Sequence, residues 1–236
     1  MSFYLTDAEW EAVKLSLQVA GLAIAIALPP AVLLGYVLAR WKFPGHTLVN
    51  ALVHLPIVLP PVVTGYVLLV LFGRQGVLGA FFADVFGIVF AFRWTGAALA
   101  AGIMAFPLII RPVKLSFELS DGQLEEASHS LGTSRLRTFL LITLPLALPG
   151  ILSGAILGFA KAMGEFGATI TFVSNIPGET RTLSLALYTE MQSLSGDAGA
   201  IRLTVIAIVV SICALVFSEV ISRRLSRKLG GQHDRR

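Results

Sequence analysis

Five stretches of this chain lack Asp, Glu, Lys and Arg altogether, and they restrict what the chain can fold into more than any other feature. They cover residues 15–39, 43–73, 94–110, 138–160 and 203–218. A helix that crosses the hydrocarbon core of a bilayer needs about twenty predominantly apolar residues. The third and fifth runs reach this length when Arg93 and the Val220–Ile221 pair are included, because long side chains extend to the interface. The pattern predicts five membrane-spanning helices.

Composition agrees with a lipid environment. Apolar residues make up 56% of the 236 residues and charged residues only 14%, whereas soluble domains carry about a quarter charged residues. The same numbers exclude a disordered chain, and the single cysteine excludes a disulfide scaffold. We therefore expect an all-α membrane protein forming one transmembrane domain over 1–236, with spans at about 13–39, 46–73, 93–117, 138–161 and 201–222.

The distribution of Lys and Arg predicts the orientation, because positively charged loops stay on the cytoplasmic side. With five spans, one set of connections and tail holds twelve basic residues and the other holds six. The larger set is Arg40, Lys42, Arg111, Lys114, Arg135, Arg137, Arg223, Arg224, Arg227, Lys228, Arg235 and Arg236. This predicts an external N-terminus and a cytoplasmic C-terminus. The start of the chain has no basic region, so we expect the first span to be retained rather than cleaved.

Prolines are frequent within the apolar runs, most densely between His54 and Gly65. Each proline removes a backbone donor and tends to interrupt a helix, which is tolerated at membrane depth only inside protein or beside a water-filled path. Proline is also common in ordinary membrane helices, so a single one carries little weight. The dense run indicates a broken helix and, with it, a transport path.

The loop at about 118–137 is the one long charged stretch between spans. Ser120 and Gln123 have the spacing of a capping box, and Gly132 suits the left-handed position that ends a helix. Leu124, Ala127, Ser128 and Leu131 share one face of the intervening helix of about eleven residues. From physics alone this is a surface helix, and an amphipathic connector on the headgroups is an equal alternative.

A motif in this loop resembles a known family. Glu126-Ala127-Ser128, three residues, Gly132, nine residues and then Ile142-Thr-Leu-Pro145 match the EAA motif of ABC importer permeases, with Ser128 in place of the second alanine. The resemblance implies a type I ABC importer permease fold in which the loop forms a cytoplasmic coupling helix that docks on a separate ATPase. The coupling residues it implies are Leu124, Glu125, Glu126, Ala127, Ser128, Leu131 and Gly132.

Further segments narrow the resemblance to the oxyanion branch of these permeases, and most closely to the molybdate permeases. They are 43–45, 55–66 and 164–182, and the similarity runs from about Leu5 to Arg223. It implies import of molybdate across a bacterial inner membrane. The implied partners are a second copy of the chain, two ATPase subunits, an external oxyanion-binding protein and membrane lipid. Sulfate or tungstate permeases of the same branch are the alternative.

Motifs for other chemistry are missing from the sequence. It contains no P-loop, no metal-ligand cluster and no hydrolase nucleophile motif, so we expect a non-catalytic subunit without cofactor, metal or nucleic-acid partner. An ATP-independent anion channel or carrier remains the alternative from a different class, and the coupling motif argues against it. We expect His54 to be a hydrogen-bonded interior group.

The end of the fourth span is the candidate gate. Lys161 and Glu165 have the spacing of an ion pair, either solvated at the interface or part of a gate. Glycines nearby allow close backbone approach, and Thr169, Thr171, Ser174 and Asn175 offer donors for a dianion. The gate and pathway candidates are Lys161, Gly164, Glu165, Phe166, Gly167 and Thr169.

Overall fold

The computed structural model describes residues 5–120, 122–193 and 197–230, and in the last segment some side chains beyond residue 213 are outside the description. This part of the chain is helical, without strands. The helices are α1 (Asp7–Arg40), α2 (His46–Val58), α3 (Pro61–Phe72), α4 (Val77–Phe86), α5 (Trp94–Leu119), α6 (Gly122–Ser130), α7 (Arg135–Thr138), a π-helix (Phe139–Thr143), α8 (Leu144–Met163), α9 (Gly167–Val173), α10 (Leu183–Gln192) and α11 (Asp197–Gly230).

The expected count of five separate spans needs correction. Among the described residues, three helical segments are long and apolar enough to cross a membrane: α1, α5 and the continuous helix Arg135–Met163. The second expected span, 46–73, is instead the pair α2 and α3, bent by 112°. The fifth, 201–222, lies within the 34-residue helix α11, whose side chains are only partly described.

Consecutive prolines explain the bend between α2 and α3. A residue that precedes proline is pushed out of the helical region, and both Leu59 (ψ 143°) and Pro60 (ψ 133°) are extended. Pro61 then starts α3, where its missing N–H costs nothing. The dense proline run therefore breaks the helix as expected, whereas Pro29, Pro30, Pro107, Pro112 and Pro149 lie inside unbroken helices.

The core is built from small residues where α1, α5 and α8 cross. Gly150 and Gly154 of α8 face the backbone of α5 so closely that a Cβ on Gly154 would lie 2.6 Å from the Ile109 carbonyl oxygen. On α1, Ala20, Ala23, Ala27 and Ala31 are buried at helical spacing. Small residues allow close helix contact in membranes, where apolar burial alone does not drive association.

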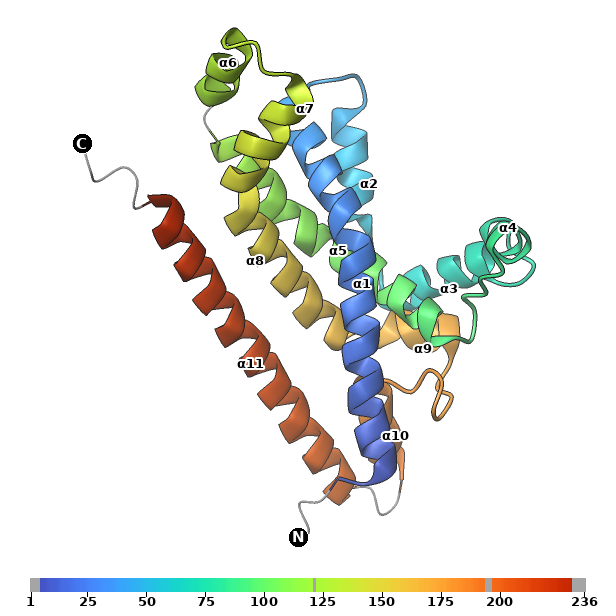
Figure 1. Ribbon diagram of the computed structural model, residues 1–236. Coiled ribbons are helices and arrows are strands. Elements are labelled where there is room, and N and C mark those ends of the chain that lie inside the picture. The colour runs from blue at the N-terminus through green and yellow to red at the C-terminus, as the bar shows by residue number, and fades with distance from the viewer. Residues whose placement is uncertain (1–4, 121, 194–196, 231–236) are drawn as a thin grey trace.

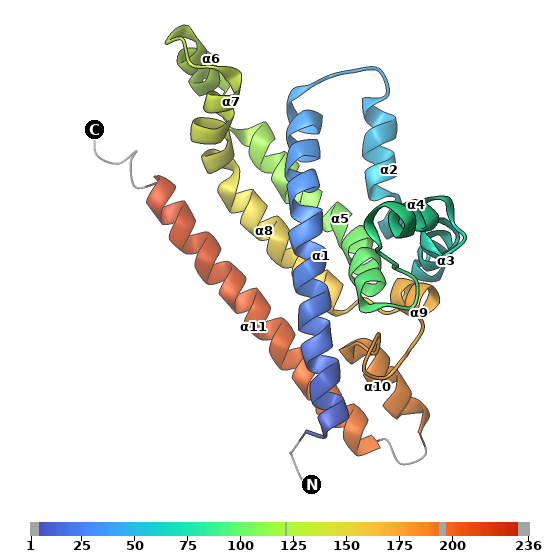
Figure 2. The same ribbon diagram turned by 45° about the vertical axis from the view of Figure 1, so that its right-hand side comes forward.

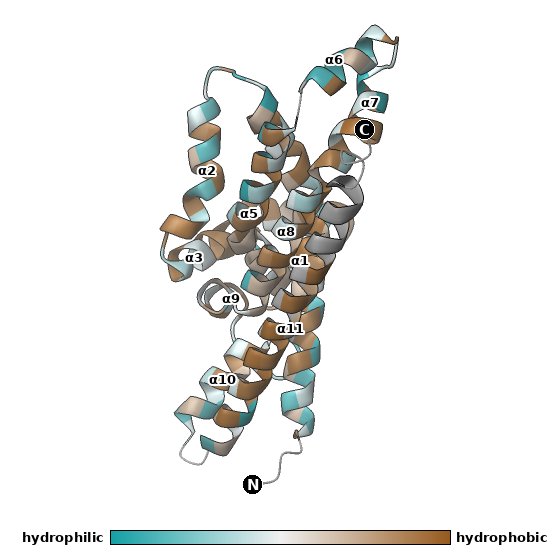
Figure 3. Ribbon diagram, turned by 90° about the vertical axis from the view of Figure 1, so that its left-hand side faces the viewer, coloured by the Kyte–Doolittle hydropathy of each residue, from teal (hydrophilic) through white to brown (hydrophobic). Residues whose placement is uncertain are grey.

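The bundle has two distinct ends (Figure 1). The helices α6 and α7 lie at one end, and the N-terminus and α10 lie at the other, with α11 along one side. A view turned by 45° shows α2 beside α1, joined to it near the α6 end (Figure 2). Hydrophilic residues gather at both ends, and apolar residues predominate on the helices between them (Figure 3).

Candidate functional site

The α6 end of the bundle presents a short helix with a defined stop. Gly132 has a φ of +82°, its N–H bonds the His129 carbonyl, and the Thr133 N–H bonds the Ser128 carbonyl. This pair of bonds is the Schellman motif. The prediction that Gly132 ends this helix is thus confirmed. Ser120, expected to open the helix, is instead the C-cap of α5.

The outward face of α6 is uncovered. Leu124, Glu126, Ala127 and Leu131 are exposed, and Leu131 retains 86% of its accessible surface. Of the four residues expected on one face, only Ser128 is buried, and its hydroxyl hydrogen-bonds the Thr138 hydroxyl at 3.0 Å. An exposed apolar helix face at the tip of a molecule is typical of a protein contact.

Glu125 points back into the bundle and anchors α6. Its Oε1 atom accepts a hydrogen bond from Arg40 Nη2 at 2.9 Å and another from Thr143 Oγ1 at 3.0 Å. The same Arg40 nitrogen also donates to the Ser120 hydroxyl at 2.7 Å. We call these four residues the α6 clasp. It ties α6 to the ends of α1 and α5 and to the π-helix.

Sequence reasoning did not single out Arg40 or Thr143 for this site. Arg40 follows an apolar run and was interpreted only as a topological charge, and Thr143 is one of many hydroxyl residues in the span. Thr143 lies in the π-helix Phe139–Thr143, which inserts a wider turn before α8. Such turns occur frequently at functional sites. One sequence signal could have identified Thr143 as a site residue, because it belongs to the motif segment that begins at Ile142.

At the C-terminal end of α8, away from α6, the structure brings Lys161 and Glu165 together. Lys161 Nζ lies 2.6 Å from Glu165 Oε2, and the Glu165 side chain is only 2% exposed. Its other oxygen accepts from the Ala168 N–H at 3.0 Å, at the start of α9. The interpretation as a solvated pair is therefore wrong on the glutamate side, because Glu165 joins α8 to α9 inside the protein.

The two candidate glycines differ in their surroundings. A Cβ on Gly167 would lie 2.7 Å from Pro61 Cβ at the start of α3, whereas the nearest atom to a Cβ on Gly164 is 3.8 Å away. The nearby Gly65 meets α9 as closely, with a Cβ placed 2.5 Å from the Ala168 carbonyl oxygen. The close approach expected here is thus between α3 and α9 of the same chain.

The other gate candidates lie around α9. Thr169 is buried, and Phe166 packs against Tyr188 with ring centroids 5.0 Å apart. The Thr171 hydroxyl donates to the Gly167 carbonyl, and the Asn175 side chain bonds both Thr189 and Arg181. Thr171 and Asn175 are therefore already engaged within the protein.

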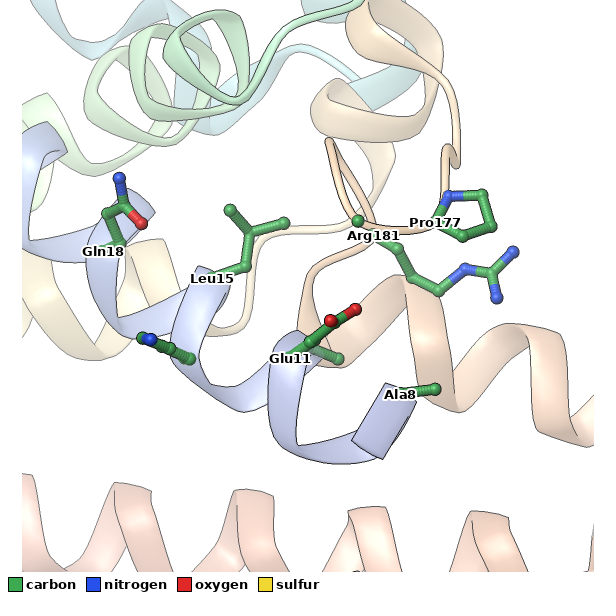
Figure 4. A pocket seen from close by; sticks show the side chains of 9 residues that line it. Ala8, Glu11, Leu15, Gln18, Pro177 and Arg181 are labelled. Carbon is green, nitrogen blue, oxygen red and sulfur yellow. The ribbon is translucent and has the colours of Figure 1, made fainter. Parts of the chain in front are cut away.

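A small polar cleft of about 260 Å³ lies at the N-terminal end of the bundle. Figure 4 shows Glu11 and Gln18 of α1 on one side and Pro177 and Arg181 on the other. The opposite end of α1 from the α6 clasp thus carries a charged surface of its own. Nearby, Arg202 of α11 donates two hydrogen bonds to the Glu9 carboxylate, which fixes α11 against α1.

Comparison with known proteins relates the whole chain to transport components. The family described as binding-protein-dependent transport system inner membrane component matches residues 31–227. Molybdenum transport system permease protein ModB of Escherichia coli K12 is 52% identical over 228 residues, which are 97% of this chain and 99% of that protein. Sulfate transport system permease protein CysT of Salmonella typhimurium is 34% identical over 84% of this chain and 71% of its own length.

A solved structure has a similar fold. The crystal structure of a bacterial alginate ABC transporter, in complex with a periplasmic protein bound to alginate pentasaccharide, matches with a TM-score of 0.73. The match covers 94% of this chain and 81% of that chain at 17% sequence identity. At this identity the likeness concerns the fold, and it confirms the expected all-α permease architecture.

Proposed function

Because the chain belongs to the family of binding-protein-dependent transport system inner membrane components, we propose that it is the permease subunit of an ATP-driven molybdate importer. The single observation that carries the substrate is the 52% identity to the molybdenum permease over nearly the full length of both proteins. Identity to the sulfate permease is 34% and covers less of both chains. We therefore propose molybdate rather than sulfate as the transported anion.

The proposed assembly contains two copies of this chain, two cytoplasmic ATPase subunits and an external oxyanion-binding protein. In this arrangement the α6 end faces the cytoplasm and the N-terminus faces outward, which follows the distribution of Lys and Arg. The exposed face of α6 supports a docking role, because its apolar residues have no contact within the chain that would cover them. ATP hydrolysis belongs to the partner subunits.

Reconstitution tests the substrate. The complex of this chain with its ATPase, in proteoliposomes with the binding protein, is expected to take up molybdate and to hydrolyse ATP faster when the binding protein is loaded. Sulfate and tungstate are offered separately, each with the same binding protein. Faster uptake of sulfate than of molybdate would reassign the substrate, and uptake without ATP would support a channel or carrier instead.

A pair of glycine variants tests the coupling role of α6. Gly132→Val forces a β-branched residue into a φ of +82°, which displaces the end of the helix. We expect normal membrane insertion but loss of uptake per ATP hydrolysed. Gly122→Ala, at the other end of α6 and with Arg40 Nη1 3.8 Å from the new Cβ, is the control. Coupled transport by Gly132→Val at the normal rate contradicts the role.

A further inference from the structure

A cavity of about 340 Å³ lies between α2 and α5, near the α6 end of the bundle. Its polar lining consists of Asn50 and His54 from α2 and Arg111, Lys114 and Glu118 from α5. None of these residues belongs to α6, to the clasp or to the gate. The cavity is therefore a separate feature, and its charged lining consists of two cations and one carboxylate.

The positive charge in this cavity is not neutralised. Lys114 pairs with Glu118 at 3.5 Å, and the Glu118 side chain is 44% exposed. The Arg111 side chain forms no ion pair or hydrogen bond with any residue in the described part of the chain. One cation is thus left over, and it is a guanidinium, whose fork of N–H groups matches the oxygens of an oxyanion.

The position of Arg111 makes this unpaired charge informative. Arg111 lies eight residues before the end of α5, about 12 Å along the helix at 1.5 Å per residue. It is exposed on the isolated chain although its helix is apolar enough to span a membrane. Charged side chains within spans face a protein interior or a water-filled path because contact with lipid is unfavourable.

The α2 side of the cavity supplies neutral polar groups. His54 Nδ1 lies 2.8 Å from the Asn50 carbonyl oxygen. A carbonyl only accepts, so this nitrogen carries the hydrogen, and His54 is the hydrogen-bonded group that was expected. Within the described residues, no hydrogen bond engages the side-chain amide of Asn50, so this lining residue has both of its N–H donors free.

From this arrangement we infer that the cavity lined by Asn50, His54, Arg111 and Lys114 binds a tetrahedral oxyanion, the transported one, on the inner half of its path. The inference rests on the proposed function and adds a site to it. One guanidinium without a carboxylate partner, together with amide and ammonium donors, holds a dianion by charge-assisted hydrogen bonds. The carboxylate of Glu118 reduces the net charge and so favours release.

Uptake by three variants tests the site in the reconstituted complex, with wild type measured in parallel. Arg111→Gln is expected to lower molybdate uptake about ten-fold, the effect of losing one charge-assisted hydrogen bond, while ATP hydrolysis stimulated by the loaded binding protein stays within about two-fold. Arg111→Lys restores part of the uptake. Asn50→Leu, at a half-buried position of α2, is expected to lower uptake as well, by a smaller factor.

The control is Lys42→Gln, which removes one positive charge from an exposed position after α1, outside the cavity lining. If both Arg111→Gln and Asn50→Leu take up molybdate at the wild-type rate, the inference is overturned but the proposed function is not. Failure of the wild-type complex to transport molybdate overturns the proposed function instead.

A lipid phosphate is the other source of the same chemistry. If the deficit of Arg111→Gln occurs only in vesicles with anionic phosphatidylglycerol and not in pure phosphatidylcholine, the site holds a headgroup and the inference is wrong.

Discussion

At the scale of single residues, small differences in surroundings separate positions that look equivalent in sequence. Gly164 and Gly167 flank Glu165 and Phe166, and both were interpreted as close-contact glycines of a gate. Only Gly167 has a close neighbour in the chain, since its Cβ position is 2.7 Å from Pro61 Cβ. The role of the two glycines in a gate remains a prediction.

Alanine at these two positions gives the first prediction. Gly167→Ala is expected to lower stability by about 1–3 kcal/mol, as overpacking does, and to reduce uptake because α9 is pushed away from α3. Gly164→Ala, at a φ of −92° with no atom closer than 3.8 Å to the added Cβ, is expected to change stability by less than about 0.5 kcal/mol. Thermal unfolding in detergent compares the two. Equal destabilisation contradicts the account.

The second residue-scale prediction concerns Glu165. Glu165→Ala removes the partner of the partly exposed Lys161 ammonium and the acceptor of the buried Ala168 N–H. We expect a loss of about 2–4 kcal/mol, because hydrogen bonds to charged groups are stronger than neutral ones and buried donors are left unpaired. Arg93→Gln breaks an exposed pair 3.8 Å long and is expected to cost less than about 1 kcal/mol. Similar losses for the two variants would show that Glu165 is solvated after all.

At the scale of elements, the α6 clasp determines how α6 is attached. Arg40 reaches Ser120 and Glu125, and Thr143 adds the π-helix to the same carboxylate. A helix of nine residues is too short to be stable by itself. Its orientation therefore depends on this clasp and on the Ser128–Thr138 hydrogen bond.

The third prediction tests the clasp as a transmitter of motion. Arg40→Gln removes the charge that holds both Ser120 and Glu125, and we expect uptake per ATP hydrolysed to fall about ten-fold, in line with the loss of a charge-assisted hydrogen bond. Arg40→Lys keeps the charge but not the geometry, so partial recovery is expected. ATPase activity and uptake are measured on the same vesicles. A proportional fall in both rates argues for a purely structural role.

At the scale of the whole molecule, one chain leaves much apolar surface uncovered. Along α2 and α3, Leu48, Leu52, Val58, Val62 and Tyr66 are all more than half exposed. Lipid covers such surface in general, but within the described residues the break between the helices leaves the Leu59 carbonyl without a backbone donor, and this group needs protein or water around it. This favours a second copy of the chain beside α2 and α3.

The fourth prediction follows from that surface. Native mass spectrometry of the purified complex is expected to show two copies of this chain with two ATPase subunits. Val62→Glu, on the exposed face of α3, is expected to reduce the two-copy species if this face lies between the copies. The control is Trp10→Glu, at an exposed position far from α3 in sequence. A complex with one copy contradicts the assembly.

The sequence by itself determined the features that depend on local chemistry. Uncharged runs indicate apolar helices because the lipid core excludes charge, the proline run at 56–61 breaks its helix because proline lacks a donor, and Gly132 ends α6 because a positive φ suits glycine. Motif spacing also identified the family, since it is a pattern along the chain.

Only the tertiary structure decided which residues meet. The sequence separates Arg40 from Glu125 by 85 positions, and no local pattern pairs them. Burial of Glu165, the contact between Gly167 and Pro61, and the grouping of His54 with Arg111 likewise depend on how α2, α3, α5 and α9 pack. Helix propensity and hydropathy act within a few turns of chain, whereas these contacts are set by close packing of small residues between helices distant in sequence.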